Sequence, residues 1–162
     1  MNYRQATVLD TPIGGIGVSV SDGAVTGVSF GAVASDEPGD LEPVLADAVA
    51  ELAAYFAGER LEFSVATVLL RGSAFERAVW GQIAAIPYGE TRSYGRIAHA
   101  VGEPGGAQAV GLACNRNPLP LIIPCHRVIG SDGKLVGFGG GLHRKRWLLQ
   151  LEARISIEHA FG

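Results

Sequence analysis

The chain has 162 residues, 48% of them hydrophobic, and a formal net charge of −3. This length allows one compact domain or two small ones, and the apolar content is sufficient for a packed core. No stretch approaches the roughly 20 apolar residues that span a bilayer, and the N-terminus does not resemble a secretion signal, so we expect a cytoplasmic protein with no membrane partner.

Charge is divided unevenly along the chain. Residues 1–70 contain two basic and ten acidic residues, a net charge of −8, whereas residues 71–162 contain eleven basic and six acidic ones, a net charge of +5. A basic C-terminal portion is typical of a surface that faces a polyanion, although an unevenly charged surface without such a partner gives the same pattern. The shift in charge predicts a domain boundary near Leu70.

The first thirty residues have the pattern of short strands. Residues 4–9, 16–20 and 24–30 are rich in strand-forming side chains, and turn residues separate them at 10–15 and 21–23. Runs of this length with such short connections predict a small antiparallel meander.

Residues 41–58 follow with helical periodicity, and Gly58 is a plausible stop. Residues 62–70 then predict another strand. Residues 1–70 contain neither paired carboxylates beside a base nor a phosphate-binding glycine loop, so we interpret them as a scaffold domain. The apolar positions at helical spacing are Leu41, Leu45, Ala48, Leu52 and Phe56.

From Gly72 onward the periodicity is helical. Ser73 and Glu76 form a capping box ahead of a helix predicted over 74–86, in which Trp80 is expected in the core. The buried stripe of this helix is predicted to be Phe75, Val79, Ile83 and Ile86.

Two shorter helices are predicted next, over 93–101 with Ser93 as its cap and over 107–115. A tight turn that contains glycine joins them, and the second helix is rich in Ala and Gly. This is the outline of a helix-turn-helix, although two ordinary packed helices give the same pattern.

The two cysteines, Cys114 and Cys125, form no CxxC pair and have no His cluster beside them, so neither a disulfide framework nor a structural zinc site is indicated. We expect Cys114 to be a small buried side chain of its helix. Cys125 is different, because His126 and Arg127 follow it directly. A histidine acting as base, directly or through water, would supply the thiolate that is the actual nucleophile. Neighbouring residues of a strand point to opposite faces, so His126 must reach the thiol through a turn or a bridging water.

Residues 117–128, NPLPLIIPCHRV, resemble the active-site signature of the O6-alkylguanine-DNA alkyltransferases, also called methylated-DNA-protein-cysteine methyltransferases. The resemblance covers the chain from about Phe75 to Glu152. Further matching motifs are IPYGETRSYGRIA at 86–98, AVG at 109–111, GFGGG at 137–141 and RKRWLLQLE at 144–152.

The resemblance implies an α+β fold. A small N-terminal antiparallel sheet with a helix occupies residues 1–70, and a helical DNA-binding domain with a winged helix-turn-helix and the active site occupies residues 71–162. It also implies direct damage reversal. A flipped guanine transfers its O6-alkyl group to the cysteine by in-line displacement, once per molecule, with no cofactor and no metal. The implied partner is double-stranded DNA that contains O6-alkylguanine, or O4-alkylthymine, bound by a monomer that can assemble cooperatively.

The resemblance also assigns roles at the active site. Cys125 would be the nucleophile and alkyl acceptor, His126 would deprotonate it through a water, and Glu152 would orient that histidine. Asn117 would fix the turn beneath the site. Tyr94 would crowd a phosphate during base rotation and protonate the leaving guanine. From the residues alone, Glu152 reads as a solvated helix end and Tyr94 as a half-buried core aromatic.

Other positions would hold the base and the duplex. The backbone carbonyls of Cys125 and Val128 would accept from the guanine amino group, and the Gly139 amide would lie near O6. Phe138 and Gly140 would belong to the lid of this pocket. The expected DNA-binding residues are Tyr94, Ala107, Gln108, Arg116 and Ser131.

Gln108 departs from the family pattern, which usually has an arginine there that enters the duplex in place of the extruded base. Glutamine lacks the charge and planar stacking surface of arginine, so nucleotide capture is affected more than the chemistry. Two alternatives remain: a sensor of alkylated DNA, against which Cys125 argues, and a Cys-His hydrolase unrelated to DNA.

Overall fold

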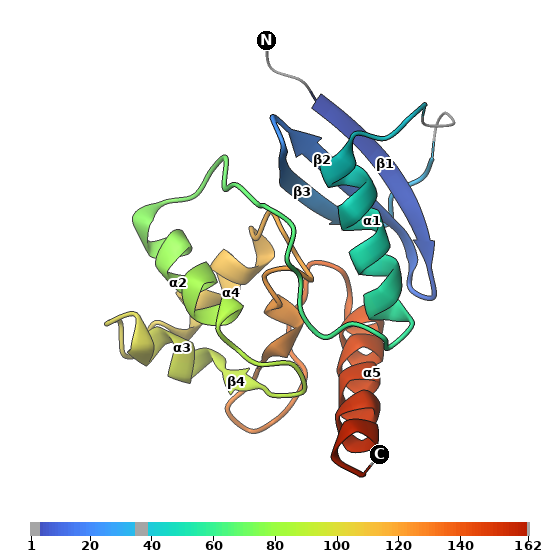
Figure 1. The fold of residues 1–162 in the computed structure, drawn as a ribbon. Helices are drawn as coiled ribbons and strands as arrows, with labels where there is room; N and C mark the ends of the chain where they lie inside the picture. Colours follow the sequence, from blue (N-terminus) through green and yellow to red (C-terminus); the bar gives the residue numbers. More distant parts are fainter. Residues whose placement is uncertain (1–3, 35–38, 162) are drawn as a thin grey trace. The chain divides into compact units, whose positions relative to one another are not determined.

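The computed structural model describes residues 4–34 and 39–161, and the chain divides into two compact units, residues 1–70 and 71–162 (Figure 1). The first unit contains a small antiparallel sheet and one helix, and the second is mainly helical. The α+β fold expected from the sequence is confirmed. Within the two described ranges, no helix is both long and apolar enough to cross a membrane.

The sheet of the first unit is an antiparallel meander of β1 (Arg4–Thr11), β2 (Gly14–Ser21) and β3 (Ala24–Phe30), in that order, as predicted. The turn between β2 and β3 places Asp22 and Gly23 at φ values of 50° and 82°. Two consecutive left-handed residues are the signature of a tight hairpin turn, and an Asp-Gly pair favours it.

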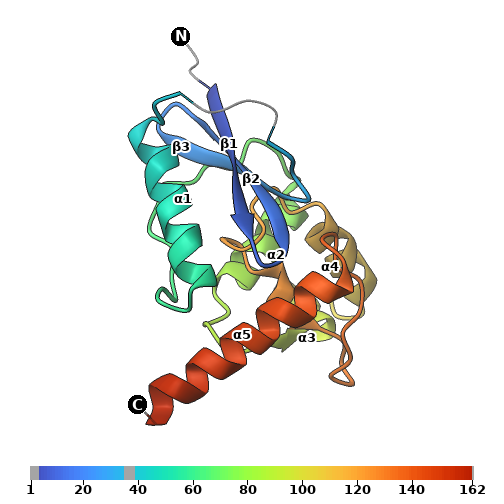
Figure 2. The ribbon, with the colours of Figure 1, turned by 90° about the vertical axis from the view of Figure 1, so that its right-hand side faces the viewer.

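Helix α1 (Pro43–Phe56) contacts all three strands, and Figures 1 and 2 show it lying along one face of the sheet. It begins two residues after Leu41, which therefore lies outside the helix, and Gly58 follows its end with a φ of 76°. The core of this unit comes from alternate strand residues and one helical stripe: Ile16, Val18, Val20, Leu45, Ala48, Leu52, Tyr55 and Phe56.

The strand predicted over 62–70 is wrong. Only Thr67 pairs with β3, in a single parallel bridge to Val25. The preceding backbone bonds to a side chain instead, because one carboxylate oxygen of Glu51 accepts the amide of Ser64 at 2.7 Å and the other accepts its hydroxyl at 2.8 Å. A segment whose amides are taken by a helix side chain cannot extend the sheet.

The second unit begins with α2 (Ala74–Ala84), whose start has the predicted capping box. Ser73 accepts the Glu76 amide at 3.1 Å, and Glu76 accepts the Ser73 amide at 2.9 Å. The helix ends two residues earlier than expected. Trp80 is buried and donates to the Ala113 carbonyl at 2.8 Å, which ties α2 to α4 (Ala107–Asn115).

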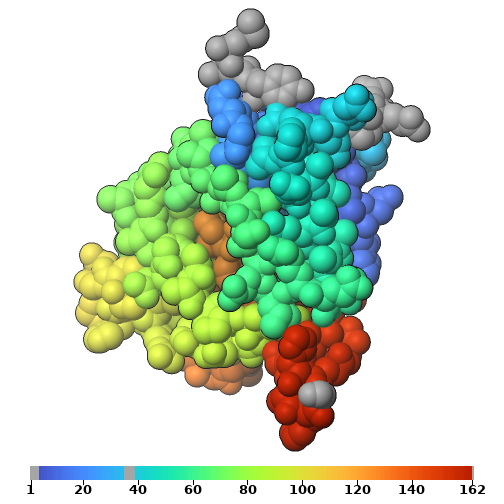
Figure 3. All heavy atoms as spheres, in the orientation of Figure 1, coloured from blue at the N-terminus to red at the C-terminus, as the bar shows by residue number. Residues whose placement is uncertain are grey.

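Helix α3 (Tyr94–Ala100) is capped by Ser93 as predicted, and it packs against α4. In Figure 3 the yellow atoms of the turn that joins α3 and α4 lie at the surface, and residues 102–105 of this turn are exposed. The parallel strands β4 (Arg92–Ser93) and β5 (Val128–Ile129) pair over two residues each. Helix α5 (Leu142–Phe161), seen along its length in Figure 2, is the last element.

The core of the second unit contains buried apolar residues from α2, α3, α4 and α5. Phe75, expected in this core, is only half-buried because it lies in the first turn of α2. The buried apolar residues of the helices are Val79, Trp80, Ile83, Ile97, Ala98, Val110, Ala113, Leu148, Leu151 and Ile155.

Candidate active site

Cys125 begins a short 3-10 turn, η1 (Cys125–Arg127), and its side chain is 3% exposed. Asn117 lies beneath it. The Asn117 side-chain amide donates to the Cys125 Sγ at 3.0 Å and to the Ile123 carbonyl at 2.8 Å, and its oxygen accepts the Leu119 amide at 2.8 Å. One side chain therefore closes the turn and touches the sulfur that follows it.

The same turn contains a strained residue. Leu121 is buried and has a φ of 76°, a left-handed backbone conformation that bulky side chains rarely adopt. Such a residue costs about 1–3 kcal/mol and persists only where its surroundings enforce it. Here the Ile123 amide donates to the Leu119 carbonyl at 2.8 Å across the turn. The chain thus enters the active site through a tightly constrained loop.

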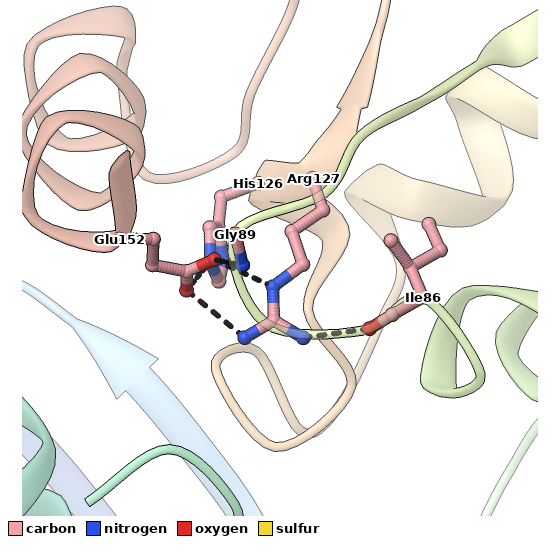
Figure 4. A network of polar contacts seen from close by, with 5 residues as sticks. All are labelled: Ile86, Gly89, His126, Arg127 and Glu152. Atoms are coloured by element: carbon pink, nitrogen blue, oxygen red, sulfur yellow. Dashed lines mark hydrogen bonds and ion pairs between the residues drawn. The ribbon is translucent and has the colours of Figure 1, made fainter. Parts of the chain in front are cut away.

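His126 and Arg127 both turn toward Glu152 of α5 (Figure 4). His126 Nε2 lies 2.7 Å from Glu152 Oε2, and Arg127 donates to both oxygens of that carboxylate, at 2.8 and 3.0 Å. The Gly89 amide adds a donor at 3.2 Å, and the third guanidinium nitrogen of Arg127 donates to the Ile86 carbonyl at 2.8 Å. All three charged or titratable side chains are buried.

The electrostatics of this cluster favour a neutral histidine beside an ionised carboxylate. Burial alone would raise the pKa of Glu152, but the hydrogen bonds and charges of His126 and Arg127 hold it well below its usual range. Burial lowers the pKa of His126, and the hydrogen bond to Glu152 opposes this only in part. Because Arg127 already balances the Glu152 charge through two hydrogen bonds, His126 need not carry a proton on both nitrogens.

This arrangement fixes the histidine tautomer. Nε2 donates its hydrogen to Glu152, which leaves a lone pair on Nδ1. Within the described part of the chain, the buried Nδ1 of His126 has no hydrogen-bond partner. A buried polar atom without a partner is unfavourable and is often a place where water or a reactant binds.

Cys114 does not occupy the core position expected for it. It is only half-buried on α4. Burial, and then this neighbouring thiol, raise the pKa of Cys125, while the Asn117 hydrogen bond and the Lys145 charge lower it. The resting nucleophile is thus a protonated thiol that needs a base.

Lys145 of α5 lies fully buried beside this site. Its ammonium group donates to the backbone carbonyls of Val128 and Val136 and lies 3.4 Å from the Tyr94 hydroxyl. Burial lowers the pKa of Lys145 and raises that of Tyr94. Tyr94 also donates to the carbonyls of Val136 and Gly137, so it is tied to the loop after β5.

A cavity of about 440 Å³ opens next to Tyr94. Four of the five residues expected to bind DNA line it: Tyr94, Ala107, Gln108 and Ser131. Its other walls are Gly95, Gly111, Leu112, Asn115, Gly130, Val136 and Gly137, so α3, α4 and the loop after β5 enclose it together.

Other expected site residues lie outside this cavity. Arg116 is exposed and pairs with Glu76 at 3.5 Å. Phe138 lies 6.0 Å from the Lys145 nitrogen, measured to the ring centroid. Gly139 is exposed and Gly140 is buried in the same loop. Across residues 4–34 and 39–161, no group of three or more His, Cys, Asp or Glu side chains could hold a metal ion.

The roles of Arg127 and Lys145 were not predicted from the sequence, although a signal exists. Lys145, Leu148 and Glu152 are spaced three and four residues apart, so they share one face of α5. Charged residues on the apolar stripe of a helix are expected to be paired when buried. That spacing places Lys145 and Glu152 on the buried face, where Glu152 meets Arg127.

Two family models match the chain. One is described as 6-O-methylguanine DNA methyltransferase, ribonuclease-like domain, and matches residues 5–69. The other is described as 6-O-methylguanine DNA methyltransferase, DNA binding domain, and matches residues 74–154. Together they account for most of the sequence.

Curated relatives are named methylated-DNA–protein-cysteine methyltransferase. That of Mycolicibacterium paratuberculosis is 60% identical over 68% of this chain and 67% of its own length. That of Mycobacterium leprae is 59% identical over 66% of this chain and 64% of its own length. A solved structure of Mycobacterium tuberculosis OGT in complex with DNA is similar with a TM-score of 0.83 and 46% identity, over 93% of both chains.

Proposed function

Since the chain belongs to the 6-O-methylguanine DNA methyltransferase family, we propose that it repairs DNA directly by moving the alkyl group of O6-alkylguanine to its own Cys125. The observation that carries the proposal is the chain of contacts around that thiol. Asn117 donates to the sulfur, the adjacent His126 has a free Nδ1, and Glu152 holds the opposite side of the ring.

His126 acts as the base. Its Nδ1 accepts the thiol proton through a water, while Nε2–H remains bonded to Glu152 as the ring becomes positively charged. The carboxylate stabilises that charge, and Arg127 keeps the carboxylate ionised and in place. The thiolate forms only when a proton acceptor is available, which agrees with a resting Cys125 whose pKa is raised by burial.

The transfer is a displacement at the alkyl carbon. The sulfur of Cys125 forms the new S–C bond as the C–O6 bond breaks, and the bonding electrons pass to the guanine. The Tyr94 hydroxyl supplies the proton that the leaving guanine takes up, and Lys145, which contacts this hydroxyl, assists that transfer. The products are an S-alkylcysteine and unmodified guanine.

The base enters through the cavity beside Tyr94. A guanine stacked in a duplex cannot present its alkyl carbon to a buried sulfur, so the nucleotide must be rotated out first. Helix α4 carries Ala107 and Gln108 to the rim of the cavity, and Ser131 lies opposite in the loop after β5. These residues hold the opened double-stranded DNA while one chain acts on one lesion.

The loop after β5 covers the base. Lys145 and Tyr94 hold the backbone at Val136 and Gly137. The Val128 carbonyl accepts from the guanine amino group, and Phe138, Gly139 and Gly140 form the lid, with the Gly139 amide near O6. Residues 1–70 serve as a scaffold domain.

The test is the mass of the intact protein after incubation with a duplex that contains O6-methylguanine. A dialkyl thioether is a poor leaving group, so each molecule gains one methylene unit and then stops. The added mass lies on the tryptic peptide 117–127, which contains Cys125. Cys125→Ser is the matched control and gains nothing. Repair beyond one lesion per molecule, or hydrolysis of an ester or amide with turnover, rejects the proposal.

A further inference from the structure

Both cysteines of the chain lie in the second unit and are bonded to Asn117. Asn117 reaches both cysteines, because its backbone amide donates to the Cys114 carbonyl at 3.2 Å while its side chain donates to the Cys125 sulfur at 3.0 Å. After burial, the Cys114 side chain is the next cause that raises the pKa of the Cys125 thiol, as expected of neighbouring thiols. Alkyl transfer uses only one of these sulfurs, so the second needs another explanation.

Cys114 lies on the face of α4 that is turned toward the active site. A Cβ atom on Gly111 would lie 3.9 Å from the Tyr94 ring, which places that face against Tyr94. Cys114 follows Gly111 by three residues and so projects from the same side of the helix. Val110 and Ala113, one position before Gly111 and Cys114, lie on the adjoining side of the helix and are buried in the core.

The two thiols differ in accessibility. Cys114 is half-buried, and its helix neighbour Asn115 lines the 440 Å³ cavity that opens to solvent beside it. Cys125 is 3% exposed. A reagent in solution therefore meets Cys114 first, and Cys125 is reached from within the protein.

We propose that Cys114 and Cys125 close a reversible disulfide by exchange with a low-molecular-weight disulfide. In the first step the Cys114 sulfur attacks the reagent, R–S–S–R, and forms a mixed disulfide while one R–SH leaves with the proton. In the second step the Cys125 sulfur attacks the Cys114 sulfur of that mixed disulfide and expels the second R–SH. Two protein thiols are oxidised and one reagent disulfide is reduced.

The bond has two consequences for the active site. While the disulfide is closed, Cys125 cannot form the thiolate that accepts the alkyl group, so repair stops until the bond is reduced. This consequence rests on the proposed function. The same bond protects the sulfur from the irreversible oxidation that ends in sulfinic or sulfonic acid. Cys114 is thus a resolving thiol, with no part in alkyl transfer itself.

The experiment uses the full, reduced chain without DNA and 4,4′-dithiodipyridine as the disulfide. We expect two thiopyridone molecules released per protein and an intact mass lower by two hydrogens. We also expect a tryptic cross-link between peptides 97–116 and 117–127, which contain one cysteine each. The second release is independent of reagent concentration because it is intramolecular. A chain that retains the pyridyl adduct on Cys114, or whose cross-link joins two molecules, overturns the proposal.

Two single variants complete the assignment. Cys125→Ser should release one thiopyridone and keep the adduct on Cys114, whereas Cys114→Ser should lose the fast first release. Cys114→Ala provides a second variant if the serine change impairs folding. The wild-type mass and cross-link decide the proposal without either variant.

Repair assays separate this proposal from the proposed function. Oxidised wild type should fail to accept a methyl group and should recover after treatment with dithiothreitol, while Cys114→Ser given the same reagent should show no such reversible loss. A reduced protein that closes the disulfide yet never accepts a methyl group contradicts the proposed function alone. A protein that repairs DNA but forms no internal disulfide contradicts only the disulfide.

Discussion

His126 and Glu152 are joined by a 2.7 Å hydrogen bond between Nε2 and Oε2, and both side chains are almost fully buried. The bond determines which ring nitrogen can take up a proton, because the carboxylate already occupies the other. It therefore connects a residue of α5, through the imidazole ring, to the reactivity of a thiol on η1.

Removing the base should slow alkyl transfer. His126→Ala should reduce the single-turnover rate on an O6-methylguanine duplex by about 100-fold or more, which is typical of lost general-base help. Glu152→Gln should change the rate in the same direction, since it removes the charge that stabilises the protonated ring. DNA affinity should stay near that of the parent. A His126→Ala protein that reacts at the parental rate removes His126 from the mechanism.

Removing Arg127 should destabilise the protein. Arg127→Met leaves the buried Glu152 carboxylate without its main counter-charge, and breaking a buried ion pair in this way costs about 3–5 kcal/mol. Arg154→Met is the matched control, because Arg154 forms only an exposed pair with Glu158 at 3.7 Å. That change should cost no more than about 0.5 kcal/mol. Urea unfolding measures the loss of unfolding free energy for both variants. Equal losses would show that the buried ion pair stabilises the protein no more than the exposed one.

Stability should fall when the solution is acidified below neutrality. The pKa of His126 is lowered in the folded protein from its usual 6.5, so the unfolded chain binds more protons between these two values. Stability conferred by a neutral buried histidine is therefore present above pH 6.5 and lost as the pH falls. Glu152, whose folded pKa lies below 4.5, adds a loss at lower pH in the same direction.

The measurement is the free energy of unfolding as a function of pH, for the parent and for His126→Gln. His126 accounts for a slope of at most about 1.4 kcal/mol per pH unit, and the variant should lose that part. His99→Gln is the control, because it removes an exposed histidine in place of the buried one. If both variants keep the parental slope, the acid sensitivity comes from other groups.

Restoring an arginine at Gln108 should improve capture of the nucleotide. Opening the duplex costs a few kcal/mol, and a guanidinium can both fill the vacated position and interact with flanking phosphates. Gln108→Arg should strengthen DNA binding, steepen its salt dependence by about one phosphate contact at most, and speed repair of duplex DNA. Reaction with free O6-benzylguanine should barely change. Equal acceleration of both substrates would mean that Gln108 does not fill the vacated site.

Local patterns predicted much of the second unit. The Ser73 capping box, the Ser93 cap and the successive helices depend on residues three or four apart, and each was confirmed. The strand predicted over 62–70 failed because its apolar, β-branched composition gives no sign that Glu51, on a helix, binds the Ser64 amide. Propensity describes what a segment tolerates, and tertiary partners decide which option it takes.

The contacts of the active site were harder to predict. The motif around Cys125 identified the thiol and its neighbouring base, but the pairing of Arg127 with Glu152 joins residues 25 positions apart. The prediction that Cys114 is buried in the core was wrong for a related reason. Helical spacing shows that it shares a face with Gly111, whereas only the folded chain shows that Tyr94 and Cys125 lie on that side.

The left-handed backbone at Leu121 makes this position selective between isomers. Leucine and isoleucine have the same atoms and nearly the same volume, yet branching at Cβ crowds a left-handed backbone far more than branching at Cγ. Glycine would relieve the backbone and leave a hole in the core. Leu121→Ile should therefore lower the melting temperature although hydrophobicity is conserved, and an unchanged value would show that the turn adapts. At this position the shape of the side chain, rather than its hydrophobicity, decides whether the loop can hold the Cys125 thiol in place.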